Sequence, residues 1–395
     1  SHSSNILTIN LNRTYNPGEI VEVKVNYSHK NVSDKAFYAS GGHVFTDCEP
    51  EGARKWFPCY DKPSDKATLD LTARVKGTVK LGSNGRLADS TVRGDTAYYH
   101  WISSHPISTY LMVMSAKVNY GLNVTNWPRP SNPSVLVPIR FYYNSGESIT
   151  SIKTKVYNMM THFSNRYGEY PFEKNGFATL SSQFTWGGME NQTLTSLCKN
   201  CWNENIISHE LGHQWYGDMI SPATWADIWL NEGFATYSEA VWFEYTGGYT
   251  SYKNDINNNA SYYLSNNPGW AMYNPSWAVT TPSTSTLFNT AITYYKGACV
   301  LHMLRYTLGE SLFFDFMESY AMDSLSGFKY NTAATDDVTA KLSSVVGEDM
   351  TWFIDQWVKQ PNHPVYQNQY NFISLGGGNW KLAFTINQTQ TNSPF

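Results

Sequence analysis

The sequence predicts an α+β chain built from more than one domain. Its 395 residues, 41% of them hydrophobic, are enough for two or three domains with buried cores. Within the first 120 residues, apolar and polar residues alternate with the period of a half-buried strand, as in Ile20–Tyr27 and Thr68–Val75. From about residue 148 onward, apolar residues recur at helical spacing instead. We therefore expect an N-terminal β domain followed by a mainly helical domain.

Turn and breaker residues divide this pattern into elements. Turn signals at Asn16–Gly18 and Ser83–Gly85 separate N-terminal strands, and the proline-rich stretch Trp127–Pro133 indicates a connector. A helix is expected at Ser148–Tyr167, and a strand at Lys174–Leu180. The other expected elements are a helix at 206–217, a helix at Trp229–Tyr245 closed by Gly247 and Gly248, loops and short helices over 246–290, helices at Ile292–Arg305, Leu312–Tyr320 and Asp336–Val346, and two strands within 365–395.

The composition excludes some classes of partner and favours an exported protein. The net charge is −4 with no basic run, which argues against nucleic acid as a partner. No apolar run approaches the roughly 20 residues that a membrane-spanning helix needs. Charged residues make up only 15%, while Tyr, Trp, Asn, Ser and Thr are plentiful. This surface chemistry is typical of a secreted, periplasmic or extracellular protein.

The cysteines leave at least one thiol unpaired, because there are five of them. Cys198 and Cys201 form a C-x-x-C, which could be a redox pair, half of a zinc site or a tight disulfide. A second such pair, which a structural zinc site would need, is absent from the sequence. We favour a disulfide in an exported protein.

The strongest chemical signal is an H-E-x-x-H motif at His209–His213. On a helix, side chains four residues apart lie on one face, so both imidazoles can reach one metal ion. Glu210 can then reach a water on that ion without being a ligand. Ile206, Ile207, Leu211 and Trp215 recur at helical spacing, which supports a buried helix here.

Glu232 is the candidate third ligand. A catalytic zinc takes three protein ligands and keeps one position open. Glu232 stands in the first turn of the next expected helix, among apolar neighbours, where an unpaired carboxylate is costly. The alternative is a first-turn glutamate stabilised by the helix dipole. Considered with the preceding helix, the pattern favours a metal.

These residues resemble those of the M1 aminopeptidases, the gluzincins related to aminopeptidase N and leukotriene A4 hydrolase. Eighteen residues separate His213 from Glu232, which lies within N-E-G-F-A, as in that family. The metzincins are excluded, because they place a third histidine soon after the motif and Gln214–Gly217 contains none. The resemblance implies one zinc ion per chain, held by His209, His213 and Glu232.

Two further segments resemble substrate-binding motifs of the family. Asp47–Pro63 resembles a loop of the N-terminal β domain and implies that Glu49 meets the free amino group of the substrate; Asp47 stands where the family usually has Gln. Phe184–Asn191 resembles the G-x-M-E-N exopeptidase motif, with Gly188 in place of the usual Ala. Extended glycines allow another backbone to approach, so a peptide could pair there as an added strand. The substrate-binding candidates of this segment are Gly187, Gly188, Met189, Glu190 and Asn191.

Trp186 precedes that motif and is a candidate wall of the pocket for the first side chain of the substrate. The last motif is Y-x-K-G at Tyr294–Gly297, whose register implies that Tyr294, and not its neighbour Tyr295, donates to the oxyanion. The resemblance covers nearly the whole chain. It implies a partial N-terminal β-sandwich or saddle domain at 1–120, a thermolysin-like, mainly helical catalytic domain with a small mixed sheet at 121–364, and the start of a further β domain at 365–395. We expect the chain to be truncated at both ends relative to the family.

The implied activity is removal of the N-terminal residue from peptides. Glu210 would act as general base toward a metal-activated water, and Tyr294 would stabilise the oxyanion. Glu49 and Glu190 would hold the substrate's ammonium group, which makes a free N-terminus necessary. The alternatives are a thermolysin-type endopeptidase, which has no use for that pair, a catalytically silent peptide-binding scaffold, and epoxide hydrolysis as in the leukotriene enzyme.

Overall fold

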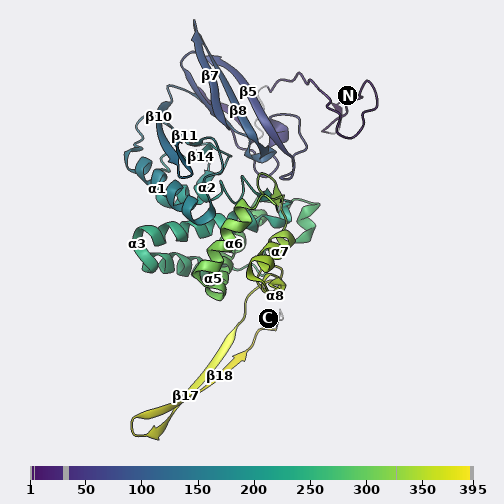
Figure 1. Ribbon diagram of the computed structural model, residues 1–395. Coiled ribbons are helices and arrows are strands. Elements are labelled where there is room, and N and C mark those ends of the chain that lie inside the picture. The colour runs from purple at the N-terminus through teal and green to yellow at the C-terminus, as the bar shows by residue number, and fades with distance from the viewer. Residues whose placement is uncertain (1, 4, 30–34, 326, 392–395) are drawn as a thin grey trace. The chain divides into compact units, whose positions relative to one another are not determined.

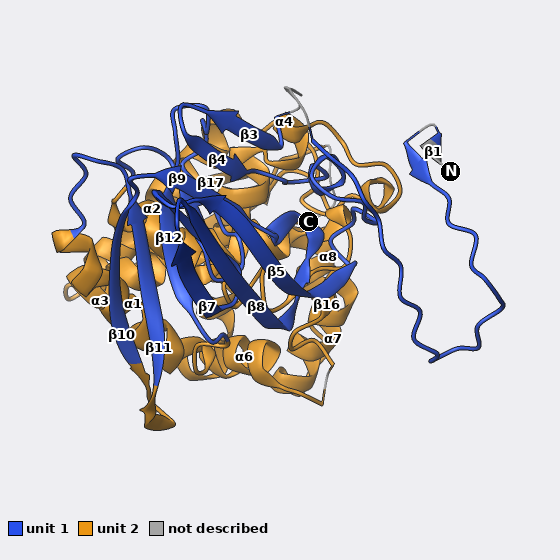
Figure 2. Cartoon of the chain, turned by 90° about the horizontal axis from the view of Figure 1, so that it is seen from above, with its two compact units in different colours: residues 1–127, 136–149, 172–201 blue, residues 128–135, 150–171, 202–395 orange. Residues whose placement is uncertain are grey.

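The computed structural model describes residues 2–3, 5–29, 35–325 and 327–391 (Figure 1). The chain divides into two compact units (Figure 2). Unit 1 comprises residues 1–127, 136–149 and 172–201, and unit 2 comprises residues 128–135, 150–171 and 202–395. Unit 1 carries most of the sheets and unit 2 carries the helices, so the predicted α+β class with an N-terminal β-rich part is confirmed.

Two antiparallel sheets form the N-terminal part of unit 1. The first has the order β3-β4-β9-β6, with β3 at Phe37–Ser40, β4 at His43–Thr46, β9 at Met114–Val118 and β6 at Val79–Ser83. The second has the order β5-β8-β7, with β5 at Lys66–Lys76, β8 at Thr96–Ser108 and β7 at Arg86–Arg93. A core cluster joins Leu81 and Ala116 of the first sheet to Trp101 of the second. The predicted strand Thr68–Val75 is confirmed within β5.

The predicted strand Ile20–Tyr27 is wrong. Residues 8–29 form no strand, and the only ladder near them pairs β1 (His2–Ser3) with β2 (Ile6–Leu7) among the described residues. Ile20 is 94% exposed. Alternation specifies two faces of a strand, but a strand also needs a neighbour whose main-chain groups pair with its own. The predicted turn at Asn16–Gly18 is confirmed, because the Glu19 amide donates to the Asn16 carbonyl at 3.1 Å.

A five-stranded mixed sheet of order β10-β11-β12-β14-β13 follows. Its strands are β10 (Gly121–Arg129), β11 (Asn132–Tyr143), β12 (Asn175–Thr179), β14 (Thr195–Leu197) and β13 (Gly188–Met189). Strands β11, β12 and β14 run parallel, whereas β13 is antiparallel to β14. The predicted strand Lys174–Leu180 is therefore confirmed. The predicted connector Trp127–Pro133 is wrong, because these residues form the end of β10, a turn and the start of β11.

The helices of unit 2 carry the H-E-x-x-H motif. The longest are α1 (Thr150–Tyr167), α2 (Glu204–Gly212), α3 (Trp229–Asn266), α5 (Gly297–Leu308), α6 (Glu310–Met322), α7 (Thr335–Val346) and α8 (Thr351–Trp357). The shorter elements of unit 2 are α4 (Thr284–Leu287), the π-helical segment η5 (Thr290–Lys296), and the parallel pair β15 (Ser221–Pro222) and β16 (Thr332–Ala333). Unit 2 also contains the 3-10 turns η3 (Trp225–Asp227) and η4 (Pro275–Ala278). Two further 3-10 turns, η1 (Ala53–Lys55) and η2 (Thr109–Leu111), lie in unit 1. In the described ranges, no helix is both long enough and apolar enough to cross a membrane.

Helix α3 continues beyond its predicted end. Gly248 has φ 71° and ψ −175°, which kinks the helix, but helical structure resumes and extends to Asn266. The prediction of loops from residue 246 is therefore wrong as far as Asn266. Tyr252, Ile256 and Tyr263 are buried at helical spacing after the kink, and this burial holds the second stretch in place.

The two C-terminal strands are confirmed. They are β17 (Tyr366–Gly376) and β18 (Asn379–Gln388), which pair with each other as an antiparallel hairpin.

Candidate metal centre

Three side chains from α2, its C-terminal cap and α3 converge on one point in unit 2. The Nε2 atoms of His209 and His213 lie 3.1 Å apart. The Oε2 atom of Glu232 lies 3.2 Å from the first and 3.3 Å from the second. All three side chains are largely buried. The structure thus brings together the three residues that the sequence proposed as metal ligands.

The second nitrogen of each ring is hydrogen-bonded to an oxygen, which leaves the converging nitrogen of a neutral ring free to bind a metal. The Nδ1 atom of His213 lies 3.1 Å from the Tyr216 carbonyl oxygen, which can only accept a hydrogen bond. The Nδ1 atom of His209 lies 2.8 Å from a carboxylate oxygen of Glu239. Each Nδ1 therefore carries a proton, and in a neutral ring Nε2 presents a lone pair. When both rings are neutral, two lone pairs and a carboxylate oxygen within 3.3 Å repel one another unless a cation lies among them, which can be a metal ion or a proton on His209.

The spacing of the three atoms fits zinc. A tetrahedral zinc with bonds of about 2.0–2.1 Å separates its ligand atoms by roughly 3.3 Å. The observed separations are 3.1, 3.2 and 3.3 Å. Two imidazoles and one carboxylate also form a known catalytic zinc ligand set, which leaves one coordination position open.

Glycines at two helix crossings allow this convergence. A Cβ atom on Gly212 of α2 would lie 2.7 Å from the Ser238 side chain of α3. A Cβ atom on Gly297, the first residue of α5, would lie 2.7 Å from the Cα atom of Gly233 in α3. These contacts are too short for any other residue, so the backbones approach closely only because both partners in the second crossing are glycines. Gly212 lies within the H-E-x-x-H motif, directly before His213, and Gly233 directly follows Glu232.

We expect Gly297→Ala to destabilise the protein by about 1–3 kcal/mol, because the added methyl group meets rigid backbone at Gly233. Thermal and denaturant unfolding of the zinc-loaded protein would measure the loss. Tyr306→Ala is the matched control, since it places the same residue in α5 at a position that is 88% exposed. A surface change of this kind stays within about 0.5 kcal/mol. Equal stability of the two variants would contradict the close crossing.

Sequence reasoning did not identify Glu239. Its carboxylate accepts from Nδ1 of His209 at 2.8 Å, and the side chain is nearly buried. Glu239 follows Glu232 by seven residues, which is two helical turns, so both carboxylates lie on the same face of α3. That spacing could have revealed it. A carboxylate in this position orients the imidazole and makes Nε2 a better donor to a metal.

The same carboxylates control the protonation of His209. Burial lowers its pKa, but the hydrogen bonds to Glu232 and Glu239 outweigh burial and raise the pKa well above the ordinary 6.5. Burial likewise opposes ionisation of Glu232, yet the two histidines lower the pKa of that carboxyl to about 2. His209 is therefore protonated at pH 7 when no metal is bound.

We expect zinc binding at pH 7 to release about one proton, because His209 must lose it to become a ligand. The apparent zinc affinity should rise with pH until the pKa of His209 is passed. Titration calorimetry in buffers of different ionisation enthalpy measures the number of protons released. His213→Ala, which removes a ligand, is the control for heat unrelated to this site. Zinc binding without proton release would contradict the raised pKa.

Glu210 lies beside the ligands without joining them. It follows His209 by one position on α2, and its side chain is buried, with 5% of the residue exposed. A carboxylate oxygen of Glu210 lies within 4.8 Å of a ring nitrogen of His213. A carboxylate at this distance can exchange a proton with a small molecule held between it and the metal.

The π-helical segment η5 places Tyr294 against the same site. The Tyr294 ring stacks on the His209 ring, with centroids 5.9 Å apart and an interplanar angle of 19°. Tyr295 instead packs edge-on against Tyr262 of α3. The structure therefore distinguishes the two adjacent tyrosines and brings the predicted one to the histidines. Short π-helical segments frequently occur at functional sites.

The predicted substrate-binding residues Glu49 and Glu190 come together within unit 1. Their carboxylate oxygens lie within 4.8 Å of each other, and Glu190 is buried. Asp47 is a third acid nearby: burial and the charge of Glu190 raise its pKa to about 7, against a hydrogen bond from Trp186 that lowers it. Trp186 is 55% exposed. A pair of close carboxylates favours a cationic ligand.

The other predicted residues of this segment lie on or beside the terminal strand of the mixed sheet. Gly188 and Met189 form β13 and pair with β14 on one side. The Gly187 carbonyl accepts from the Cys198 amide at 3.0 Å, and the Asn191 side chain accepts from Ser196 at 2.8 Å. In the sheet order of the described strands, β13 stands last, so its other edge has no strand beside it. An edge of this kind can accept a peptide as an added strand.

The cysteines of this region are paired as the sequence favoured. Cys198 and Cys201 form a disulfide, whereas Cys48, Cys59 and Cys299 take part in no disulfide.

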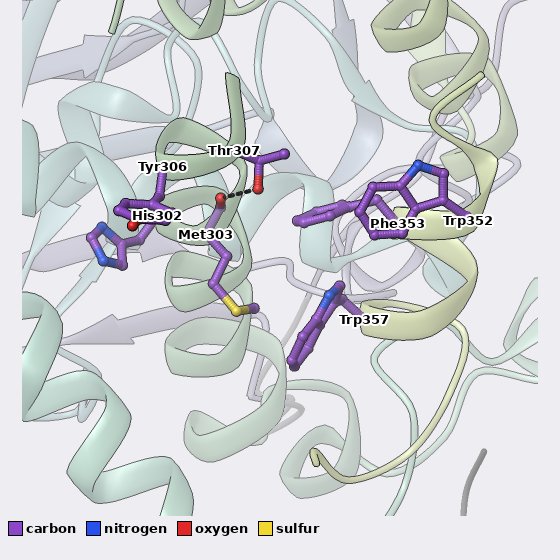
Figure 3. Close-up of a pocket in the computed structure, with 7 residues that line it drawn as sticks. All are labelled: His302, Met303, Tyr306, Thr307, Trp352, Phe353 and Trp357. Atoms are coloured by element: carbon purple, nitrogen blue, oxygen red, sulfur yellow. Dashed lines mark hydrogen bonds between the residues drawn. The ribbon is translucent and has the colours of Figure 1, made fainter. Parts of the chain in front are cut away.

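One cavity of about 350 Å³ lies elsewhere in unit 2, between α5 and α8 (Figure 3). It includes none of the predicted site residues, so its size says nothing about the metal centre. Its lining residues are His302, Met303, Tyr306, Thr307, Trp352, Phe353 and Trp357.

Comparison with known proteins identifies the family. The peptidase family M1 domain matches residues 153–357, which is more than half of the chain, and the peptidase M1 N-terminal domain matches residues 1–111. The chain belongs to peptidase family M1. The predicted resemblance and the predicted zinc are thereby confirmed, since the solved structures of this family that match are zinc metallopeptidases.

M1 relatives share about a quarter of their residues with the chain. A probable aminopeptidase 1 from Sulfurisphaera tokodaii is 26% identical over 87% of this chain and 45% of its own length. Aminopeptidase N from Lactococcus lactis is 28% identical over 79% of this chain and 38% of its own length. The chain thus spans less than half the length of these M1 relatives. The M1 zinc metallopeptidase from Deinococcus radiodurans superposes with a TM-score of 0.70 and 26% identity, covering 84% of this chain and 72% of that one.

Proposed function

We propose that this M1 chain is a zinc-dependent aminopeptidase that removes the N-terminal residue from peptides. The observation that carries the proposal is the convergence of three buried atoms, from His209, His213 and Glu232, beside the carboxylate of Glu210. Relatives named aminopeptidases support it. A mutant of the Deinococcus radiodurans enzyme, solved with a Tyr-Ser-Ala substrate, supports a peptide as the ligand class.

The chemistry divides between the metal and the chain. His209, His213 and Glu232 would hold the zinc ion, which would supply Lewis acidity to a water and to the scissile carbonyl when bound. Glu210 takes the proton of the attacking water and delivers it to the leaving amine. The Tyr294 hydroxyl donates to the oxygen on which negative charge develops. Glu239 holds the His209 ring in the orientation and tautomer that leaves Nε2 free for the metal.

Glu49 and Glu190 are the reason to propose cleavage at the N-terminus of a peptide and not within it. Two close carboxylates repel each other and are stabilised by a cation. The α-ammonium group of a peptide supplies that cation, whereas an internal peptide bond supplies none. A peptide without a free N-terminus would therefore leave the pair uncompensated, which selects against endopeptidase cleavage.

The test compares Tyr-Ser-Ala with its N-acetylated form on the zinc-loaded chain. We expect release of free tyrosine from the first peptide and a kcat/KM at least about 100-fold lower for the second, because acetylation removes the charge that the acidic pair binds. A C-terminally amidated peptide is the control and should be cleaved like the free acid. Equal hydrolysis of acetylated and free peptides would identify an endopeptidase. Absence of turnover on all three would identify a silent scaffold.

We also propose that this M1 chain acts outside the cytosol. The disulfide between Cys198 and Cys201 supports this, because disulfides persist mainly in oxidising compartments. Alkylation of the protein purified from its native source, followed by mass spectrometry, should modify only Cys48, Cys59 and Cys299 after unfolding. Modification of all five cysteines would contradict the proposal.

A further inference from the structure

The acidic pair of unit 1 needs other contacts to hold it together. Glu49 lies in the loop after β4 and Glu190 follows β13, yet their carboxylate oxygens lie within 4.8 Å of each other. Two like charges at this distance repel each other whenever no cation is bound between them. The two segments that carry these carboxylates must therefore be fixed by the surrounding structure of unit 1.

Asn84 is a buried side chain in the turn between β6 and β7, and it joins three segments of unit 1. Its Nδ2 atom donates to the Gln192 carbonyl at 2.7 Å and to the Leu111 carbonyl at 3.0 Å. Its Oδ1 atom accepts from the Val113 amide at 2.7 Å. The carbonyls can only accept and the amide can only donate, so these partners fix the orientation of the Asn84 side chain. Both of its N–H groups and its oxygen are thus used.

The segment that carries Glu190 is attached to this corner. A main-chain hydrogen bond of 2.9 Å closes a turn over residues 191–194. Within that turn the Thr193 hydroxyl oxygen accepts from the Gly85 amide at 2.8 Å. Thr193 has φ 65°, a conformation that a residue other than glycine keeps only where its surroundings impose it. The hydrogen bonds from Asn84 and Gly85 thus fix the backbone two and three residues after Glu190.

The loop that carries Glu49 is attached to the same corner through β9. Met114, the first residue of β9, donates its amide to the Thr46 hydroxyl oxygen at 3.0 Å. Thr46 is the last residue of β4 and precedes Glu49 by three positions. Val113, the residue before Met114, donates its own amide to Asn84. A path of hydrogen bonds and adjacent residues therefore links the two acid-bearing segments, and Asn84 lies at its centre.

We propose that Asn84 is a positioning residue of the ammonium site: it sets the separation of Glu49 and Glu190, and thereby the affinity for a free N-terminus. Asn84 is fully buried, so it acts through the segments that it joins and not by contact with the peptide. Carboxylates held at a fixed separation bind the ammonium group without first being brought together against their own repulsion. The proposal rests on the proposed recognition of the peptide N-terminus by this pair.

The affinity of Tyr-Ser-Ala for the zinc-loaded Glu210→Gln chain, measured by titration calorimetry, tests the proposal without turnover. We expect Asn84→Ala in this background to weaken binding at least about 10-fold, because the two carboxylates are no longer held at the separation that suits the ammonium group. N-acetyl-Tyr-Ser-Ala has no ammonium group, so the change should leave its weaker binding within about twofold.

Tyr99→Phe is the matched control. It also removes a hydrogen bond to a main-chain carbonyl, that of Val79 at 2.9 Å, but at the other end of β6 from Asn84. The affinities for both peptides should stay those of the Glu210→Gln background.

Thr193→Val is a milder test that remains if Asn84→Ala does not fold. It keeps the branched shape of the side chain and removes the hydroxyl that accepts from Gly85. We expect it to weaken binding of Tyr-Ser-Ala by about threefold or more, whereas Thr193→Ser keeps the hydroxyl and should bind like its background.

The outcomes separate positioning from stability. A residue with a purely structural role would lower the unfolding temperature but leave the peptide affinity of the folded protein unchanged, and that result overturns the proposal. Equal weakening for the free and the acetylated peptide, or weakening by Tyr99→Phe, also overturns it. A Glu210→Gln background that binds the two peptides equally, or binds neither, overturns it together with recognition of the N-terminus. Failure of the peptidase function is a different result: the parent chain would bind Tyr-Ser-Ala without cleaving it.

Discussion

Glu210→Gln is expected to lower kcat at least about 1,000-fold while leaving the zinc content at one ion per chain. The amide has the size of the carboxylate but cannot accept a proton, and general-base catalysis contributes about 10²–10⁴-fold. Zinc should remain because the three converging atoms belong to His209, His213 and Glu232, not to Glu210. Steady-state hydrolysis of a free aminoacyl substrate and elemental analysis measure the two quantities.

Glu204→Gln is the matched control for this experiment. Glu204 stands in the same helix, α2, but at its first turn, where it pairs with Lys155 and accepts from Trp242 at 3.0 Å. Losing a partly exposed ion pair costs little, so kcat should stay within about twofold of the parent. Near-normal turnover by Glu210→Gln would show that another group accepts the proton. Loss of zinc in that variant would show instead that Glu210 belongs to the ligand set.

The sequence was sufficient to predict the two histidine ligands of the metal centre, because they are close in the chain and the period of the helix fixes their relative positions. A helix puts His209 and His213 on one face whatever surrounds it, and the structure brings their Nε2 atoms to 3.1 Å. Glu232 required the additional inference that the next helix packs against the first. That packing depends on Gly212 of α2, where an added Cβ atom would lie 2.7 Å from the Ser238 side chain of α3.

The errors in the fold have a common physical cause. Ile20–Tyr27 has the alternation of a strand, and the helix after Trp229 has a glycine pair that usually ends one. In the first case no described strand lies alongside, and in the second case buried residues beyond Gly248 restore the helix. Local pattern sets what a segment can form, whereas packing partners decide what it does form.

The last large effect expected is that of Tyr294→Phe, which should lower kcat about 100–1,000-fold with little change in KM or zinc content. A donor aimed at developing negative charge stabilises the transition state more than the neutral ground state, so its loss appears in kcat. Tyr294 is the candidate donor because its ring stacks on that of His209, one of the three converging residues. The backbone that carries it is anchored, since the buried Lys296 of the same segment donates to the Gln360 carbonyl at 3.2 Å.

Tyr295→Phe separates this role from a structural one. It removes the same hydroxyl from the adjacent residue of η5, whose ring packs edge-on against Tyr262 and not against the histidines. A change in the stability of the segment would affect both variants, whereas loss of an oxyanion donor would affect only Tyr294→Phe. The assignment fails if the two variants lose activity equally, or if Tyr294→Phe raises KM and spares kcat, because the hydroxyl would then bind substrate and transition state alike.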